Sequence, residues 1–155
     1  MRDTPNVDDA NLALRLYDLR REAELRKARA TVGRLVAGQP WEKVRPLFDH
    51  DHAENAHLRQ VTSYWEIVAS FVNRGIFHPD VYLDTCGEGV FTLWAFRPHL
   101  DRIRAMGRPR FLVETERLVK ASPAASERLD AIDRSMAARA AAAKPRSKGK
   151  PKRKG

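Results

Sequence analysis

The chain has 155 residues, a formal net charge of +9 and a single cysteine, Cys86. Its length fits one domain, and a hydrophobic content of 43% is enough for a core without a disulfide or metal. One thiol cannot form an internal disulfide, the N-terminus has no apolar run typical of a secretion signal, and no apolar stretch approaches the ~20 residues that a membrane helix needs. We therefore expect a soluble, cytoplasmic protein.

Basic residues are concentrated at the C-terminal end. Seven of the twelve residues from 144 to 155 are Lys or Arg, and residues 137–155 hold eight of the 29 basic residues and none of the 20 acidic ones. The charge therefore divides into about +8 on this segment and about +1 on the rest. We expect a flexible N-terminus over residues 1–8, a helical domain over residues 9–136, and an Ala-rich to Lys/Arg-rich tail over residues 137–155 that is disordered from Lys144 onward.

A long N-terminal helix is the first predicted element. Asp8 or Asp9 can cap it by accepting a hydrogen bond from a free backbone N–H. Apolar residues follow at helical spacing, namely Leu12, Leu16, Leu19 and Ala23. The helix should end near Ala37, which gives ~29 residues and a length of about 43 Å. We expect its first half to pack and its charged middle to be solvated, with a coiled-coil-like dimer through this helix as the alternative.

The strongest core pattern lies in residues 53–73. Its apolar residues keep three- and four-residue spacing: Leu58, Val61, Trp65, Val68 and Val72. This pattern predicts a central helix, which Gly75 ends by adopting a left-handed conformation. The preceding segment, residues 41–48, is interrupted by Pro46 and predicts one helical turn or a packed loop. The three tryptophans, Trp41, Trp65 and Trp94, are expected in the core.

The remaining segments also favour helices. A short helix is expected from Pro79 to the break at Gly87 and Gly89. Residues 90–96 alone fit a strand or a helix, but the three-residue spacing that continues to residue 106 favours a helix bent at Pro98. Helices over residues 109–120 and 124–143 complete the series. The sequence therefore predicts an all-α bundle of about five helices.

Three segments carry a family resemblance. They are TSYWE at residues 62–66, VASFVNRG at residues 68–75 and DTCGE at residues 84–88. These segments resemble a family of bacterial proteins known only as a domain of unknown function, and residues 12–21 are similar to that family's first helix. The resemblance covers roughly residues 10–120 and leaves out the basic tail. It implies an all-helical fold and no known activity.

One segment has the composition of a metal site. Residues 49–57 contain three histidines and three carboxylates, and on a helix His50, Glu54 and His57 would share one face. A di-iron site needs a second Glu-x-x-His pair, which the sequence lacks. An exposed, polar helix start therefore explains these residues better than a metal site. The enzymatic alternative would use Asp49, His50, His52, Glu54 and His57.

Three further residues have side chains that are candidates for catalysis. Glu66 and Asp84 could form a buried polar site, although Glu66 could equally pair with Arg59 or Arg74. Cys86 has no resolving cysteine and is expected to be a small buried residue. We therefore predict no catalytic residue and no cofactor.

The tail is the best candidate for a binding site. Its Lys, Pro and Gly residues, without aromatics, can neutralise phosphates without reading a base sequence. We predict a non-enzymatic binding or accessory protein whose tail contacts DNA or RNA and whose helical body contacts a protein or itself. A scaffold with an inert, solubilising tail is the other alternative, and an anionic membrane surface or an acidic protein is a further possible partner of the tail. The predicted nucleic-acid-binding residues are Lys144, Arg146, Lys148, Lys150, Lys152, Arg153 and Lys154.

Overall fold

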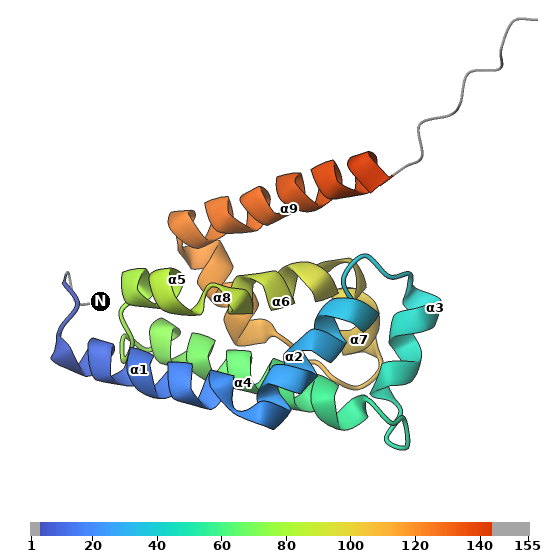
Figure 1. Ribbon diagram of the computed structural model, residues 1–155, viewed down its shortest axis with the longest axis horizontal. Coiled ribbons are helices and arrows are strands. Elements are labelled where there is room, and N and C mark those ends of the chain that lie inside the picture. The colour runs from blue at the N-terminus through green and yellow to red at the C-terminus, as the bar shows by residue number, and fades with distance from the viewer. Residues whose placement is uncertain (1–3, 144–155) are drawn as a thin grey trace, which may run out of the picture.

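The computed structural model describes residues 4–143, and within them the chain is helical and contains no strand (Figure 1). The elements in chain order are α1 (Val7–Arg21), α2 (Ala23–Leu35), α3 (Trp41–Val44), the 3-10 helix η1 (Arg45–Phe48), α4 (Asn55–Asn73), α5 (Pro79–Cys86), α6 (Glu88–Phe96), the 3-10 helix η2 (Arg97–His99), α7 (Leu100–Ala105), α8 (Val113–Ala121) and α9 (Pro123–Ala143). The predicted all-α class is confirmed. The prediction of about five helices is wrong, because two predicted segments each divide into several helices.

Helix α4 lies at the centre of the bundle. Its five predicted core residues are all buried, and Trp65 has no exposed surface. The helix packs against α2 on one side and α8 on another, with α6 also in contact. Gly75 follows its end at φ +69°, as predicted. The periodic apolar pattern therefore identified the element around which the others assemble.

The prediction of one long N-terminal helix is wrong. The chain breaks at Glu22, which has an extended conformation (φ −54°, ψ 139°) and whose carboxylate accepts a hydrogen bond from the Leu25 N–H at 3.0 Å. The start was also misplaced, because Asn6 caps α1 by accepting bonds from the N–H groups of Asp8 and Asp9. The continuous ~43 Å helix that the dimer alternative requires is therefore absent from residues 4–143.

The break at Glu22 allows both halves to pack on the bundle. Helix α1 contacts α5, whereas α2 packs along α4. The Tyr64 hydroxyl donates to the Leu16 carbonyl at 2.7 Å, and Arg29 donates to the Arg20 carbonyl at 3.1 Å. The Arg29 bond satisfies one of the last four carbonyls of α1, which lack an intrahelical partner, and the Tyr64 bond ties α4 to α1 one turn earlier. Leu16 is buried as expected, but Leu19 is 55% exposed, so the predicted apolar stripe stops before the break.

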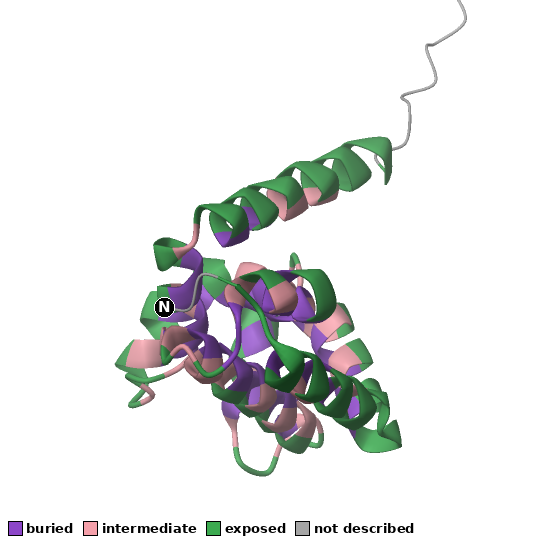
Figure 2. Ribbon diagram, turned by 90° about the vertical axis from the view of Figure 1, so that its left-hand side faces the viewer, coloured by how far each residue is buried: buried purple, intermediate pink, exposed green. Residues whose placement is uncertain are grey.

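Helix α9 packs on α6 and α8 and then extends beyond the bundle (Figures 1 and 2). Ala125 and Leu129 are buried, Ile132 is half-buried, and residues 137–143 are exposed (Figure 2). The start agrees with the sequence, since the Ser122 hydroxyl accepts from the Ala125 N–H at 3.2 Å. The N-terminal half of α9 is therefore anchored while its C-terminal half projects.

One carboxylate clamps the middle of α9. Asp133 accepts from Trp94 Nε1 through one oxygen and from Arg97 Nη2 through the other, both at 2.5 Å.

Two of the tryptophans are only partly buried. They are Trp94 and Trp41, and the ring centroid of Trp41 lies 5.7 Å from that of His99. Of the three tryptophans that were expected in the core, only Trp65 is fully buried.

Two neighbouring glycines make a matched test of packing. A Cβ added at Gly89 would overlap the Tyr82 hydroxyl and the Trp65 ring, both fully buried, whereas one added at Gly87 would overlap only the exposed Arg128 guanidinium. Because buried groups cannot move aside, Gly89→Ala should lower the free energy of unfolding by about 1–3 kcal/mol. Gly87→Ala should cost clearly less in the same urea titration, and equal losses would contradict this packing.

The Asp133 clamp should depend on pH. Hydrogen bonding from Arg97, and secondarily from Trp94, holds the pKa of the Asp133 carboxyl below its ordinary value. The ionised form therefore stabilises α9 above the unfolded pKa of about 4, and this contribution is lost as pH falls through the lower folded pKa. In an NMR titration the Trp94 indole N–H should shift with a midpoint below about 4. Asp133→Asn should remove that transition, and its persistence would exclude Asp133 as the cause.

Candidate functional site

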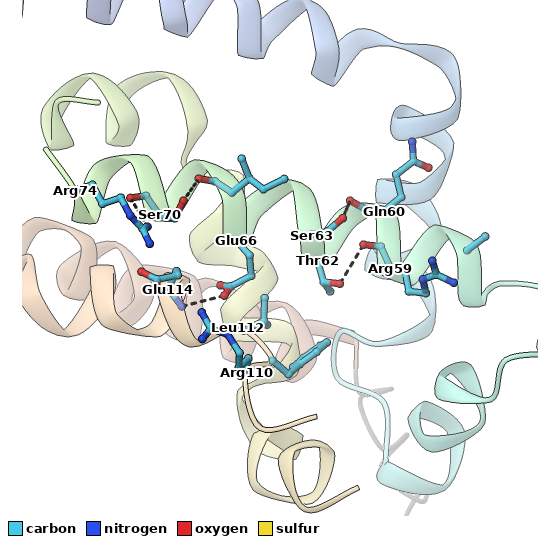
Figure 3. Close-up of a pocket in the computed structure, with 13 residues that line it drawn as sticks. Arg59, Gln60, Thr62, Ser63, Glu66, Ser70, Arg74, Arg110, Leu112 and Glu114 are labelled. Atoms are coloured by element: carbon cyan, nitrogen blue, oxygen red, sulfur yellow. Dashed lines mark hydrogen bonds between the residues drawn. The ribbon is translucent and has the colours of Figure 1, made fainter. Parts of the chain in front are cut away.

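A groove of about 780 Å³ runs along the uncovered face of α4 (Figure 3). Its floor is α4 from Ala56 to Arg74, and its far wall is residues 110–114, which lead into α8. Arg59 and Arg74 lie toward its two ends and Arg110 lies on the opposite wall (Figure 3). The groove is therefore lined by the surface of one helix and by three arginines.

Glu66 fixes the wall of this groove to its floor. Its carboxylate accepts hydrogen bonds from the Glu114 N–H at 3.0 Å, the Thr115 N–H at 2.8 Å and the Thr115 hydroxyl at 2.7 Å (Figure 3 shows the first). These are free donors at the start of α8, where a negative charge is favourable. Glu66 is therefore a capping residue for α8 rather than an acid or base.

The start of α8 corrects one predicted boundary. The helix begins at Val113 and not at Pro109, because Leu112 adopts a left-handed conformation (φ 52°) that ends the preceding turn. Leu112 is fully buried, so its packing maintains a conformation that L-residues seldom adopt. Residues 110–112 consequently form the groove wall as a loop and not as part of a helix.

The second carboxylate of the groove, Glu114, is also engaged within the protein. Asn73 Nδ2 donates to its carbonyl at 2.9 Å and to its Oε2 at 2.8 Å, and Arg117 donates to the same carboxylate at 3.1 Å. By contrast, within residues 4–143 no carboxylate lies within 4.0 Å of a side-chain nitrogen of Arg59, Arg74 or Arg110. The groove therefore presents positive charge.

The hydroxyl groups of α4 in the groove point back to their own helix. Thr62 donates to the Leu58 carbonyl at 2.9 Å, Ser63 to the Gln60 carbonyl at 3.2 Å and Ser70 to the Ile67 carbonyl at 2.8 Å. In this structure the three hydroxyls therefore donate to the helix that carries them. No histidine or cysteine is among the described residues that line the groove. The arrangement suits binding through charge and shape and lacks a nucleophile with a base.

The histidine-rich segment does not form the predicted arrangement. Residues 49–54 are turns and α4 begins at Asn55, so His50, Glu54 and His57 do not share one helical face as expected. His57 Nδ1 lies 2.7 Å from Glu54 Oε2, and this hydrogen bond lowers the pKa of the Glu54 carboxyl. His50 is exposed. In residues 4–143 no group of three or more His, Cys, Asp or Glu side chains is placed to hold a metal ion.

The other two candidates remain apart from the groove. Asp84 is exposed on α5 and does not join Glu66. Cys86 is buried as expected, burial raises the pKa of its thiol, and its polar neighbour is the Thr85 hydroxyl at 3.5 Å. The predicted nucleic-acid-binding residues, Lys144 to Lys154, lie outside the described residues.

The family model for the Domain of unknown function (DUF4760) matches residues 6–122. The chain belongs to this family. The matched residues include α1 to α8 and the whole groove, whereas α9 and the basic tail follow them. No curated protein and no solved structure matches the chain. Within the described residues no helix is long and apolar enough to cross a membrane.

The groove itself was missed at the sequence level. The sequence suggests Arg59 and Arg74 only as possible partners of Glu66, and no motif in it points to Arg110. One pattern could have identified the groove: Ala56, Ser63 and Ser70 are small residues spaced seven apart on the central helix. Such heptad spacing on a central helix indicates a face with small residues at regular positions, where a second helix can pack closely.

The capping role of Glu66 can be tested by its removal. Glu66→Ala leaves two backbone N–H groups at the start of α8 without their acceptor. A hydrogen bond to a charged group typically contributes about 1.5–3 kcal/mol to stability. We expect a loss of about 2–3 kcal/mol in the free energy of unfolding, measured in urea. Glu127→Ala, which removes an exposed carboxylate on α9, should change it by less than about 0.5 kcal/mol. Similar losses in both variants would exclude the cap.

Proposed function

We propose that the protein is a non-enzymatic binding or accessory protein whose basic tail contacts DNA or RNA without sequence preference while its helical body contacts another protein. The observation that carries the first half is the division of charge. About +8 resides on residues 137–155 and about +1 on the rest of the chain. Clustered Lys and Arg attract phosphates through their summed field, and this attraction needs no fixed fold.

The geometry of α9 supports this proposal. Its first half is held by Ala125, Leu129 and the Asp133 clamp, and its exposed residues 137–143 carry the chain away from the bundle (Figure 2). The basic residues therefore follow from a point outside the body. A long polyanion can approach such a point without colliding with the helices.

The body is suited to a different task. Its near-neutral charge gives little attraction for phosphates as a whole. The groove lacks a nucleophile and base, and the histidine-rich segment holds no three-residue group placed for a metal in residues 4–143. These features favour binding over catalysis and leave the choice of partner to the helical surface.

The salt dependence of nucleic-acid binding tests the tail directly. If all seven basic residues from Lys144 to Lys154 contact duplex phosphates, log K should fall with log salt with a slope of up to about −6. The variant Lys150→Gln/Lys152→Gln/Arg153→Gln should reduce the magnitude of this slope by up to about 3. Fluorescence anisotropy with a labelled duplex at 50–300 mM salt measures both slopes.

A body variant with the same loss of charge provides the control. Arg15→Gln/Lys27→Gln/Lys43→Gln alters three exposed residues on α1, α2 and α3 and should leave the slope unchanged. A chain ending at Ala143 should lose the salt-dependent binding. If that shorter chain binds DNA and RNA as well as the full chain, the tail has no role in binding.

A further inference from the structure

The uncovered face of α4 has the spacing of a coiled-coil seam. Six residues recur along it at alternating intervals of four and three, namely Ala56, Gln60, Ser63, Ile67, Ser70 and Arg74. All six line the groove, and none is buried. An interval of 3.5 residues on average keeps one face of a helix toward a partner helix over its whole length. The seam therefore has the geometry that receives a second helix.

The side chains of the seam allow close approach. Ala56, Ser63 and Ser70 are small, and the two serine hydroxyls bond to carbonyls of α4 itself. Ile67 stands between them with 54% of its surface exposed, although α4 is otherwise the most central helix. Small residues around one large apolar side chain form a knob and shallow holes, which is the arrangement that helix packing uses.

The arginines set the charge of the occupant. Arg59 and Arg74 are 15 residues apart on α4, which places them about 22 Å apart along the helix axis. Arg110 faces them from the other wall (Figure 3). The carboxylates nearby, Glu66 and Glu114, are used internally. Guanidinium groups without a carboxylate partner favour an occupant that supplies carboxylates.

A nucleic-acid strand fits this groove less well. The three arginines can pair with phosphates as well as with carboxylates, but the hydroxyls of α4 donate to their own helix and add no further donors. Bases need an aromatic face, and the aromatic residue at this site, Phe111, packs against Phe48 and Phe96 with ring centroids 5.5 and 5.1 Å away. Phe111 is therefore occupied by core packing, and the floor offers a helix the small and apolar side chains of the seam.

We infer that the α4 groove binds an acidic amphipathic helix of a partner protein. The apolar face of that helix packs over Ile67 and the small residues of the seam, and its carboxylates pair with Arg59, Arg74 and Arg110. The inference rests on the proposed function in one respect, that the helical body is the part that contacts proteins. It does not depend on the tail.

The test uses the full-length chain with the seven basic residues from Lys144 to Lys154 changed to Gln, because a basic tail would itself attract an acidic peptide. The probe is a synthetic helical peptide of about 20 residues with Leu and Ala on a heptad seam and Glu at the flanking positions. A second peptide replaces Glu by Lys, and a third keeps the composition but scrambles the heptad. Isothermal titration calorimetry at 50 and 300 mM salt measures binding, and NMR shift changes locate it.

Two pairs of variants separate the groove from the rest of the surface. Arg59→Gln/Arg74→Gln/Arg110→Gln removes the groove's charge, and Arg15→Gln/Lys27→Gln/Lys43→Gln removes the same charge elsewhere. Ile67→Glu disrupts the seam, and Leu14→Glu makes the same kind of change at a residue of α1 that is 66% exposed. The altered side chains are exposed, so circular dichroism should show that each variant folds.

We expect the acidic heptad peptide to bind with shift changes at Ser63, Ile67 and Ser70. The groove triple variant and Ile67→Glu should each weaken binding at least tenfold, whereas the two control variants should change it less than twofold. Equal weakening by the groove and control variants would overturn the inference, and so would equal binding of the Lys or scrambled peptide. Loss of oligonucleotide binding in the groove triple variant, without loss of peptide binding, would identify the groove as a nucleic-acid site instead.

Failure of the tail and failure of the groove give different results. The salt-series experiment with DNA and RNA depends on residues 144–154, which are neutral in every chain used with the peptides. Peptide binding without nucleic-acid binding in the native chain would retain the inference and remove the tail's role. The opposite result would remove the inference alone.

Discussion

Three successive residues of α4 hold the bundle together. Tyr64 donates to the Leu16 carbonyl of α1, Trp65 lies in the core, and Glu66 accepts the free N–H groups of α8. Successive residues of a helix point about 100° apart, so these three contacts use three directions around one axis. Burial raises the pKa of Tyr64 to about 12, which keeps its hydroxyl a donor over the physiological range. Other α4 residues, which make none of these three contacts, line the groove beside Glu66.

The sequence could predict elements whose signals are local. The buried residues of α4 repeat at helical spacing, and Gly75 and Pro79 mark a stop and a start within a few residues. The break at Glu22 was missed because helical apolar spacing continues through it. The contacts that favour two helices over one are the Glu22 cap on α2 and the packing of both helices on the bundle, including the bond from Tyr64. The start of α8 was missed for the same reason, since its capping residue comes from 48 positions earlier in the chain.

The two proposed binding sites differ in how far the sequence predicts them. The tail is a matter of composition, because charge acts without a fold, so counting residues was sufficient to propose it. The groove is defined by what α2, α8 and Leu112 do not cover. Arg110 lines the groove in the turn that ends at Leu112, whose left-handed conformation precedes the start of α8. No residue spacing within 105–115 predicts that Arg110 and α4 line the same groove.

The two proposals also assign attraction of nucleic acid and selection of a protein partner to different parts of the chain. The groove floor is α4, whereas α9, the last described helix before the basic residues, packs on α6 and α8. Under the two proposals, a tail that binds phosphates without sequence preference would bring the body to a polyanion, and the groove would then discriminate among proteins by charge and heptad spacing. When a partner protein is already bound to the same nucleic acid, a chain with two weak sites binds it as if the local concentration of that partner were high. The site proposed to select a protein partner therefore lies within the residues that match the family model, and the site proposed to attract nucleic acid lies outside them.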